Sequence, residues 1–311
     1  MSSVTRVPET TSMSGEELTA DDAWRTIRTR GATIWVEAFA RFRYGDGFSH
    51  ARALGLQLCL AFIPLVIATV GLSGTLVTQR IGRVLRLTLV SLAPGGSADL
   101  LRETLDRPGP EADGAELALW LGLLVAVVAL TTAMGQVERG ANRIYGVQRD
   151  RPGPAKYGRA LRMAFGVGLP AMVGFGVLIA VAAFGDAVEQ VYGFDDDAVT
   201  LLALPLAILL LLGSITAMLR WAPRRRQPGW SWLGLGAGVA LLLWLVFTGL
   251  LVAYVAVSGS FGAVYGPLTG VIALLLWAQL TSVAIFFGMA LSAQLEAARV
   301  GVDHGAVADP R

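Results

Sequence analysis

Five long runs without a charged residue or histidine constrain this chain more than any other feature of its sequence. Four of them hold 27, 21, 23 and 22 residues, at 53–79, 117–137, 163–185 and 198–219. An ionisable side chain at the centre of a bilayer costs about 2.5 to 3.5 kcal/mol, whereas a helix of about 20 apolar residues crosses the hydrocarbon core. Each of these four runs therefore predicts one membrane-spanning helix.

The fifth run, at 227–295, holds 69 residues and is too long for one crossing. Two clusters of turn-forming residues, 258–262 and 265–267, interrupt it, so we expect two helices with a short connection. The predicted fold class is all-α: a polytopic integral membrane protein with amphipathic helices at its interfaces. Its six spans are expected at about 53–78, 117–137, 163–185, 199–219, 233–257 and 269–291.

The composition agrees with a membrane protein and excludes most water-soluble enzymes. Hydrophobic residues make up 54% of the 311 residues and charged residues 15%, against about 25% charged in a typical soluble domain. The net charge of +2 gives no argument for nucleic acid as a partner. The single cysteine, Cys59, excludes an intramolecular disulfide and a thiolate metal cluster.

The distribution of basic residues predicts the orientation. Twenty of the 25 Lys and Arg residues fall in the N-terminal segment, the connection after the second span, the connection after the fourth span and the C-terminal tail. The other five fall in the connection 79–116, and the loop 186–198 has none. Because basic loops are retained in the cytoplasm, both termini are predicted to be cytoplasmic.

Outside the spans, we expect a disordered cytoplasmic tail at 1–20, an amphipathic cytoplasmic or interfacial helix at 21–50, the membrane domain at 51–296 and a second tail at 297–311. The 21–50 segment mixes Trp24, Trp35 and Phe39 with arginines. Two interpretations stay open: a helix in the headgroup plane, or a helix packed on the cytoplasmic loops. The connection 79–116 predicts one amphipathic helix at 81–92 and a short helix that begins at Ser97.

The sequence offers few groups for chemistry. The histidines, His50 and His304, have no metal-ligand spacing to other residues, and the acidic triplet 195–197 is typical of a solvated external loop. We therefore expect no catalytic residue, no cofactor, no bound metal and no enzymatic activity. The predicted spans contain no Asp, Glu or His, the groups that ion-coupled pumps place in the membrane.

Neutral polar and small residues remain inside the predicted spans. Gln279 lies near the middle of the last span, where an unpaired amide is costly, so it needs a partner or water. It serves either helix packing or a polar path. The Gly234 and Gly238 pair in the fifth span is typical of close helix packing, although glycines also mark broken helices around substrate sites.

The order of several motifs resembles the YihY/BrkB family of bacterial inner-membrane proteins. The segment 138–147, ERGANRIYGV, resembles the family's N-R-x-Y signature after span two. The segment 222–230, APRRRQPGW, resembles the basic loop before span five, and 261–268, FGAVYGPL, resembles the connection before span six. Residues 290–296 resemble the end of that span. The first span departs from the family pattern, because 51–58 lacks paired aromatics although Phe62-Ile63-Pro64-Leu65 is kept.

This resemblance implies a multi-pass protein of the bacterial inner membrane. The leading hypothesis is a non-catalytic transporter or flippase-like protein for a lipid or amphiphilic solute, and the alternative is a membrane scaffold for envelope assembly. Expected partners are membrane lipids and either further copies of the chain or another envelope protein, with no nucleic acid. The candidate contacts with substrate or lipid are Asn142, Tyr145, Arg139, Arg143, Gln279 and Tyr265, and the arginines 224–226 are expected either to meet anionic headgroups or to set the topology.

Overall fold

The computed structural model describes residues 5–10, 18–75, 112–147, 149–178, 196–257, 268–301, 304, 305, 307 and 308. Six helical segments in this part of the chain are long and apolar enough to cross a membrane, which confirms the predicted fold class. They are Gly47–Leu65, Glu116–Ile144, Gly153–Leu178, Leu201–Trp221, Trp230–Val257 and Thr269–Arg299. The predicted helices at 81–92 and after Ser97, and Tyr265, lie outside the described residues.

The chain order of the elements is simple. Strand β1 (Thr5–Arg6) precedes α1 (Ala20–Arg30), α2 (Thr33–Tyr44), α3 (Gly47–Thr75) and α6 (Ala112–Ile144). Then come α7 (Gly153–Met163), the π-helical turn η1 (Ala164–Gly168), α9 (Asp196–Trp221), α10 (Trp230–Val257) and α12 (Thr269–Arg299), and β2 (Val307–Ala308) follows. Residues 169–178 continue the helix beyond η1.

Several helices extend beyond the predicted spans at one end of the bundle. Helix α6 runs to Ile144 rather than to 137, and α12 runs to Arg299 rather than to 291. The prediction placed span ends at the first charged residue, but a helix continues past that point when its charges find partners. As a result, Glu138 and Glu296 lie on membrane helices and are fully buried.

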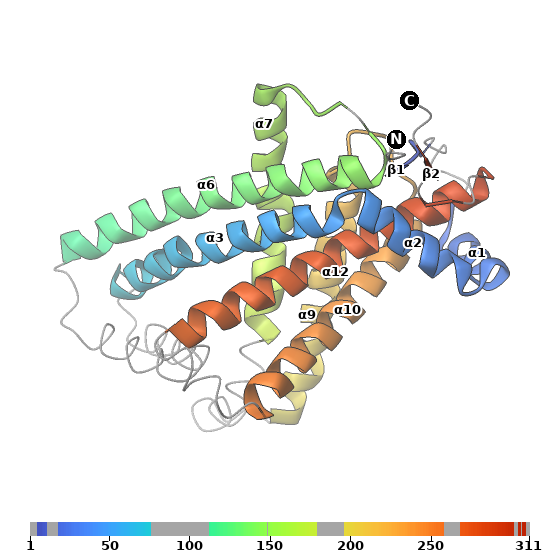
Figure 1. The fold of residues 1–311 in the computed structure, drawn as a ribbon. Helices are drawn as coiled ribbons and strands as arrows, with labels where there is room; N and C mark the ends of the chain where they lie inside the picture. The colour runs from blue at the N-terminus through green and yellow to red at the C-terminus, as the bar shows by residue number, and fades with distance from the viewer. Residues whose placement is uncertain are drawn as a thin grey trace.

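The N-terminal region also differs from the predictions. The helix expected at 21–50 is divided into α1, α2 and the start of α3, because Gly31 ends α1 with φ at 56° and Asp46, with φ at 57°, precedes α3. Thr5 and Arg6, expected in a disordered tail, form β1 and pair antiparallel with β2, Thr5 opposite Ala308. The two terminal segments therefore lie side by side, at the end of the bundle where α6 ends (Figure 1).

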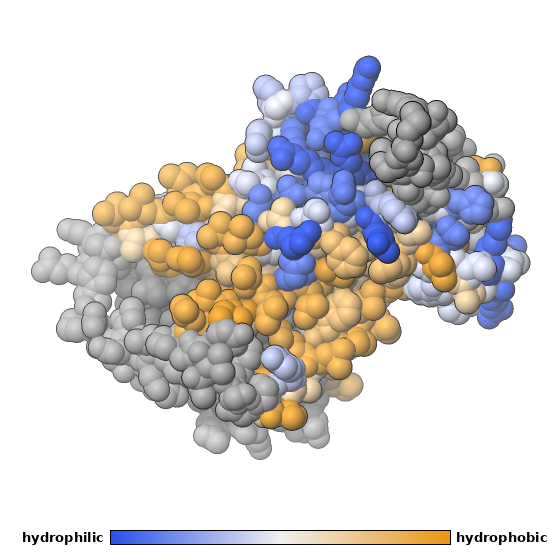
Figure 2. Space-filling model, viewed as in Figure 1, coloured by the Kyte–Doolittle hydropathy of each residue, from blue (hydrophilic) through white to orange (hydrophobic). Residues whose placement is uncertain are grey.

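That end of the bundle, which we call the polar end, holds most of the tight packing. The core there joins α2, the last turns of α6 and α12, the start of α10 and the end of α9, with Phe42, Tyr145, Trp232 and Phe286 fully buried. Hydrophilic residues gather on the outside of the polar end, and hydrophobic residues cover the helices away from it (Figure 2). Away from the polar end, the α3 and α6 pair diverges from α9 and α10 (Figure 1).

Helices α10 and α12 cross at two glycines. A Cβ added at Gly236 would lie 2.8 Å from the carbonyl oxygen of Gly288. The predicted packing pair is wrong in detail, because Gly234 and Gly238 have nothing within 4 Å of such an atom. Residues two apart on a helix point about 200° apart. Of Gly234, Gly236 and Gly238, only Gly236 therefore faces α12.

Candidate functional site

The candidate site lies at the polar end, where two connections meet the last turns of α6 and α12. One connection follows α6, and the other joins α9 to α10. Gly146, with φ at 74°, ends α6, while the N–H of Val147 donates to the carbonyl of Asn142 at 2.8 Å. This tight ending turns the chain back so that both connections reach the end of α6.

Asn142 bonds to both connections. Its Nδ2 donates to Oδ1 of Asp150 at 2.9 Å, and its Oδ1 accepts from the backbone N–H of Arg224 at 2.8 Å. The side chain is fully buried, so each bond replaces water that the amide would otherwise need. Asn142 therefore fixes the spacing between the two connections.

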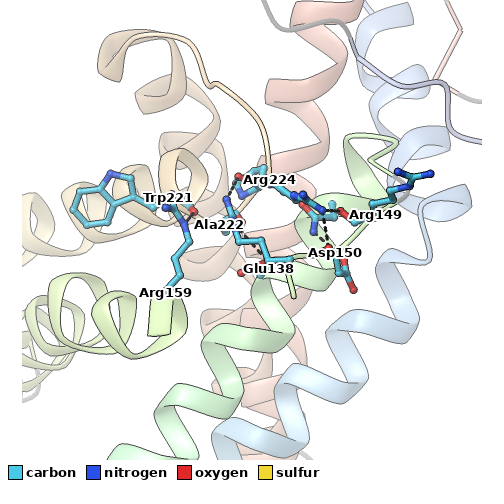
Figure 3. A network of polar contacts seen from close by, with 10 residues as sticks. Glu138, Arg149, Asp150, Arg159, Trp221, Ala222 and Arg224 are labelled. Carbon is cyan, nitrogen blue, oxygen red and sulfur yellow. Dashed lines mark hydrogen bonds and ion pairs between the residues drawn. The ribbon is translucent and has the colours of Figure 1, made fainter. Parts of the chain in front are cut away.

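Arginines complete this arrangement, which we call the loop network (Figure 3). Arg151 pairs with Glu138 at 3.0 Å and donates to the carbonyls of Ala222 and Pro223 at 3.2 and 3.1 Å. Arg224 donates to the carbonyl of Asp150 at 2.7 Å. The loop network thus joins each connection to the other and to α6. Nearby, Arg159 of α7 donates to the carbonyl of Trp221 at 2.8 Å.

A second group, the buried arginine cluster, lies where α2, α6 and α12 meet, and consists of Arg41, Tyr145, Arg225, Gln294 and Glu296. Arg225 pairs with Glu296 at 2.6 Å, and its guanidinium lies 4.8 Å from the ring centre of Tyr145. The side chain of Glu296 is fully buried and that of Arg225 is 7% exposed. An ion pair removed from water must be well bonded to offset its desolvation, so the geometry here holds the α9–α10 connection against α12.

Arg41 is fully buried, so its charged guanidinium group needs hydrogen-bond partners to offset the loss of water. Its Nε donates to Oε1 of Gln294 at 2.9 Å, and its Nη1 donates to the carbonyl of Ile144 at 3.2 Å and to Oγ1 of Thr10 at 2.9 Å. Burial lowers the pKa of Arg41 to about 10. The sequence left open whether this segment lies in the headgroup plane or packs on the cytoplasmic loops, and Arg41 itself packs inside the protein.

Tyr145 is also fully buried, and burial raises the pKa of its phenol, with the charge of Glu296 acting in the same direction. The phenol is therefore neutral at pH 7. The side chain of Gln227 interacts with its hydroxyl, whereas Nη2 of Arg41 has no hydrogen-bond partner within the described residues. A buried polar atom without a partner is uncommon in proteins, so this donor requires an explanation.

Among the predicted site residues that the structure describes, Asn142 and Tyr145 are fully buried, Asn142 in the loop network and Tyr145 in the buried arginine cluster. Arg139 and Arg143 are exposed on the surface of α6. Gln279 is half-buried on α12, where a Cβ added at Gly55 of α3 would lie 2.9 Å from its Cα. Seventeen residues separate it from Glu296, or about 25 Å along a helix.

The sequence interpretation missed Arg41, Glu138, Gln294 and Glu296 as site residues. A usable signal existed for the two glutamates, since each follows a predicted span directly with helical spacing and no turn residue. Arg224 and Arg225 were expected either to meet lipid headgroups or to set the topology, and the structure shows that their guanidinium groups bind protein atoms. Which arginine of a cluster turns inward depends on tertiary packing, which the sequence pattern does not encode.

Two further polar contacts lie within the helices. Nδ1 of His50 on α3 and Nε2 of Gln136 on α6 are 2.8 Å apart. Nε1 of Trp277 on α12 donates to Oγ1 of Thr248 on α10 at 3.2 Å, and the ring of Trp277 lies 5.2 Å from that of Phe175. Within the described residues, no three His, Cys, Asp or Glu side chains are grouped so that they could hold a metal ion.

Six apolar helices joined by buried ion pairs at one end define a multi-pass α-helical membrane protein. The model of the family described as Virulence factor BrkB matches residues 38–309, which include both the loop network and the buried arginine cluster. The chain therefore belongs to the BrkB family, also called YihY. No curated protein and no solved structure matches the chain.

Proposed function

We propose that this protein is a non-catalytic transporter or flippase-like protein of the bacterial inner membrane, which moves a lipid or amphiphilic solute. One observation carries the proposal: the Arg225–Glu296 ion pair and the loop network tie the helices together at the polar end, whereas α3 and α6 diverge from α9 and α10 away from it, with α12 packed between them (Figure 1). A bundle that is tied together at one end and whose helix pairs diverge toward the other suits one state of an alternating-access cycle.

In this proposal the loop network and the buried arginine cluster act as a gate. Opening the polar end would require breaking the Arg225–Glu296 pair, which joins the α9–α10 connection to α12. It would also require breaking the bonds from Arg151 to the carbonyls of Ala222 and Pro223, for which Glu138 of α6 holds the guanidinium. Both pairs are buried, so a substitution that removes one partner leaves an uncompensated charge and weakens closure. The basic residues exposed near this end, including Arg139 and Arg143, would attract anionic headgroups at about 1 kcal/mol each.

The test uses proteoliposomes that contain a fluorescent phospholipid. We expect lipid movement with the wild-type chain and a changed rate with Glu296→Gln, which removes the charge that holds Arg225. Glu116→Gln is the matched control, because Glu116 is exposed near the start of α6. If the folded wild-type protein moves no labelled lipid and no amphiphilic solute, the transport proposal fails.

The proposed orientation places the polar end in the cytoplasm. The four segments that hold twenty of the basic residues are the N-terminal segment, the connections after the second and fourth spans, and the C-terminal tail. The paired strands β1 and β2 also place the N-terminal and C-terminal segments side by side. A topology reporter fused after Arg311 should read as cytoplasmic. An external signal would reverse the assignment of the gate to the cytoplasmic side.

A membrane scaffold is the second candidate. Helices α1 and α2 expose large apolar side chains, with Trp24 51% and Val36 65% exposed. Exposed apolar surface rimmed by arginines suits either a membrane surface or a partner protein. Co-purification of an envelope protein in fixed stoichiometry, together with unchanged lipid movement in Glu296→Gln, would favour the scaffold over the transporter.

A further inference from the structure

Arg41 is a fully buried cation of the cluster. Glu296 acts on it electrostatically but is paired with Arg225 at 2.6 Å. Glu37 of α2 also acts on Arg41 electrostatically, but its Oε2 accepts from the backbone N–H of Gly305 at 2.6 Å and its side chain is 28% exposed. A buried cation without its own counter-charge is costly, so the cluster has a place for an anion.

A donor without a partner lies in the same cluster. Nη2 of Arg41 is buried and bonds to nothing among the described residues, and the buried hydroxyl of Tyr145 has the side chain of Gln227 beside it. The acceptors that Arg41 does have are all neutral oxygens: those of Gln294, Ile144, Thr10 and Pro8. A guanidinium prefers two oxygens of one anion, in the fork geometry that phosphate and carboxylate provide.

Two of those neutral acceptors belong to residues 5–10, which we call the N-terminal strap. Nη1 of Arg41 donates to Oγ1 of Thr10 at 2.9 Å and to the carbonyl of Pro8 at 3.4 Å, and the N–H of Thr10 donates to the carbonyl of Tyr145 at 3.1 Å. The strap thus lies directly against Arg41 and Tyr145. It supplies oxygen atoms where those of an anion would otherwise bind.

We propose that Arg41, Tyr145 and Arg225 form a binding site for a phosphate group, and that the N-terminal strap covers this site and is displaced when phosphate binds. Phosphate fits because its several oxygens accept from both the Arg41 fork and the phenol of Tyr145. The source is either free phosphate or the phosphodiester of a lipid headgroup. The proposal does not depend on transport, because binding is measured without any movement across a membrane.

Gly146 allows the strap to be loosened without touching the arginines. A Cβ added there would lie 2.6 Å from the Cα of Glu9 and 2.6 Å from the carbonyl oxygen of Pro8, both backbone atoms of the strap. Gly146→Ala therefore forces the strap away. Gly146 also has φ at 74°, so alanine adds backbone strain. Gly301→Ala is the matched control, since Gly301 has φ at 80° and nothing within 4 Å.

The experiment titrates inorganic phosphate into the purified full chain in uncharged detergent and measures binding by calorimetry. If the strap covers the site most of the time, the apparent phosphate affinity of the wild type equals the intrinsic affinity multiplied by the small fraction of molecules in which the site is uncovered. We expect Gly146→Ala to bind phosphate about tenfold or more tightly than both the wild type and Gly301→Ala. Hydrogen exchange at the N–H of Thr10 should be faster in Gly146→Ala and in phosphate.

A second substitution tests the anion site itself. Arg41→Gln in the Gly146→Ala background should abolish the gain, while Arg43→Gln, at an exposed position of α2, should keep it. If Arg41→Gln does not fold, Arg41→Lys keeps the charge but loses the fork and should still lose most of the gain. Equal phosphate affinity in the wild type, Gly146→Ala and Gly301→Ala would overturn the proposal, as would binding that survives both Arg41 substitutions.

Competition identifies the source of the phosphate. The Gly146→Ala protein is placed in nanodiscs of phosphatidylglycerol and, separately, in uncharged detergent, and phosphate affinity is compared. A loss of phosphate binding in the nanodiscs assigns the site to a lipid headgroup. Unchanged phosphate affinity in both assigns it to free phosphate, and absence of binding in both contradicts the site.

Discussion

At the scale of single residues, the polar end depends on side chains that bond in two directions. Asn142 is the clearest case, because one amide contacts both Asp150 and the backbone of Arg224. Glu138 and Glu296 act in a similar way, as each holds an arginine from a connection against a membrane helix. The same end of the bundle therefore combines its apolar core with a small number of buried polar groups that bond across it.

Asn142→Ala should reduce the free energy of unfolding by about 1 to 3 kcal/mol, because the N–H of Arg224 loses its acceptor in a buried place. Arg143→Gln, one residue further along α6 and exposed, should change it by less than about 0.5 kcal/mol. Reversible unfolding in detergent measures both. Equal stability of the two variants would mean that Asn142 does not hold the connections together.

At the scale of elements, the helices and their order were predictable, but several of their ends were not. Charge-free runs located all six spans because lipid excludes ionisable groups from its centre. The same argument ended the predicted spans of α6 and α12 too early, because Glu138 and Glu296 are paired with arginines from other parts of the chain. Of the candidate site, Asn142 and Tyr145 were identified through the family motif, whereas Arg41 depends on how α2 packs.

The crossing of α10 and α12 provides an element-scale prediction. A Cβ added at Gly288 would lie 2.8 Å from the Cβ of Ala240, so Gly288→Ala should cost about 1 to 3 kcal/mol of stability through overpacking. Gly238→Ala has open space and should be neutral or slightly stabilising. Thermal unfolding of the two variants in one detergent compares them. Similar midpoints would show that the helices do not meet at Gly288.

The attachment of α1 should depend on pH. The hydroxyl and the N–H of Thr19 donate to Oδ2 of Asp22 at 2.9 and 3.2 Å, and Arg299 pairs with Oδ1 at 3.2 Å. These contacts lower the pKa of Asp22 from its usual value of 3.8. A lowered pKa means that the stabilisation is fully present above 3.8 and is lost as pH falls through the lower, folded-state value.

Hydrogen exchange across α1 measures this effect. Amide protection in α1 should fall as the pH is taken from about 5 to below the usual carboxyl value, and Asp22→Asn should remove most of that pH dependence. Asp21→Asn, at the neighbouring position in the first turn, is the control and should leave it in place. A pH response that persists in Asp22→Asn would assign it to another group.

At the scale of the whole molecule, paired connections tie the polar end together, and α3 and α6 diverge from α9 and α10 away from it (Figure 1). Hydrophobic residues cover the surface of those helices, whereas hydrophilic residues gather at the polar end (Figure 2). In the proposed transport cycle, closure would rest on polar bonds at this end, which a ligand or a headgroup could exchange. Membrane burial alone gives no preference between an open and a closed bundle, because lipid is as apolar as the helix surfaces.

The most direct test measures the distance between the two connections. Spin labels at the exposed positions 149 and 226, in a chain in which Cys59 is replaced by serine, report this distance in nanodiscs by pulsed electron resonance. We predict one narrow distance distribution for the wild type, and a broader one shifted to longer distances when Glu138→Gln and Glu296→Gln are combined. A distribution that is already broad in the wild type, or that the two substitutions leave unchanged, would contradict the closed polar end.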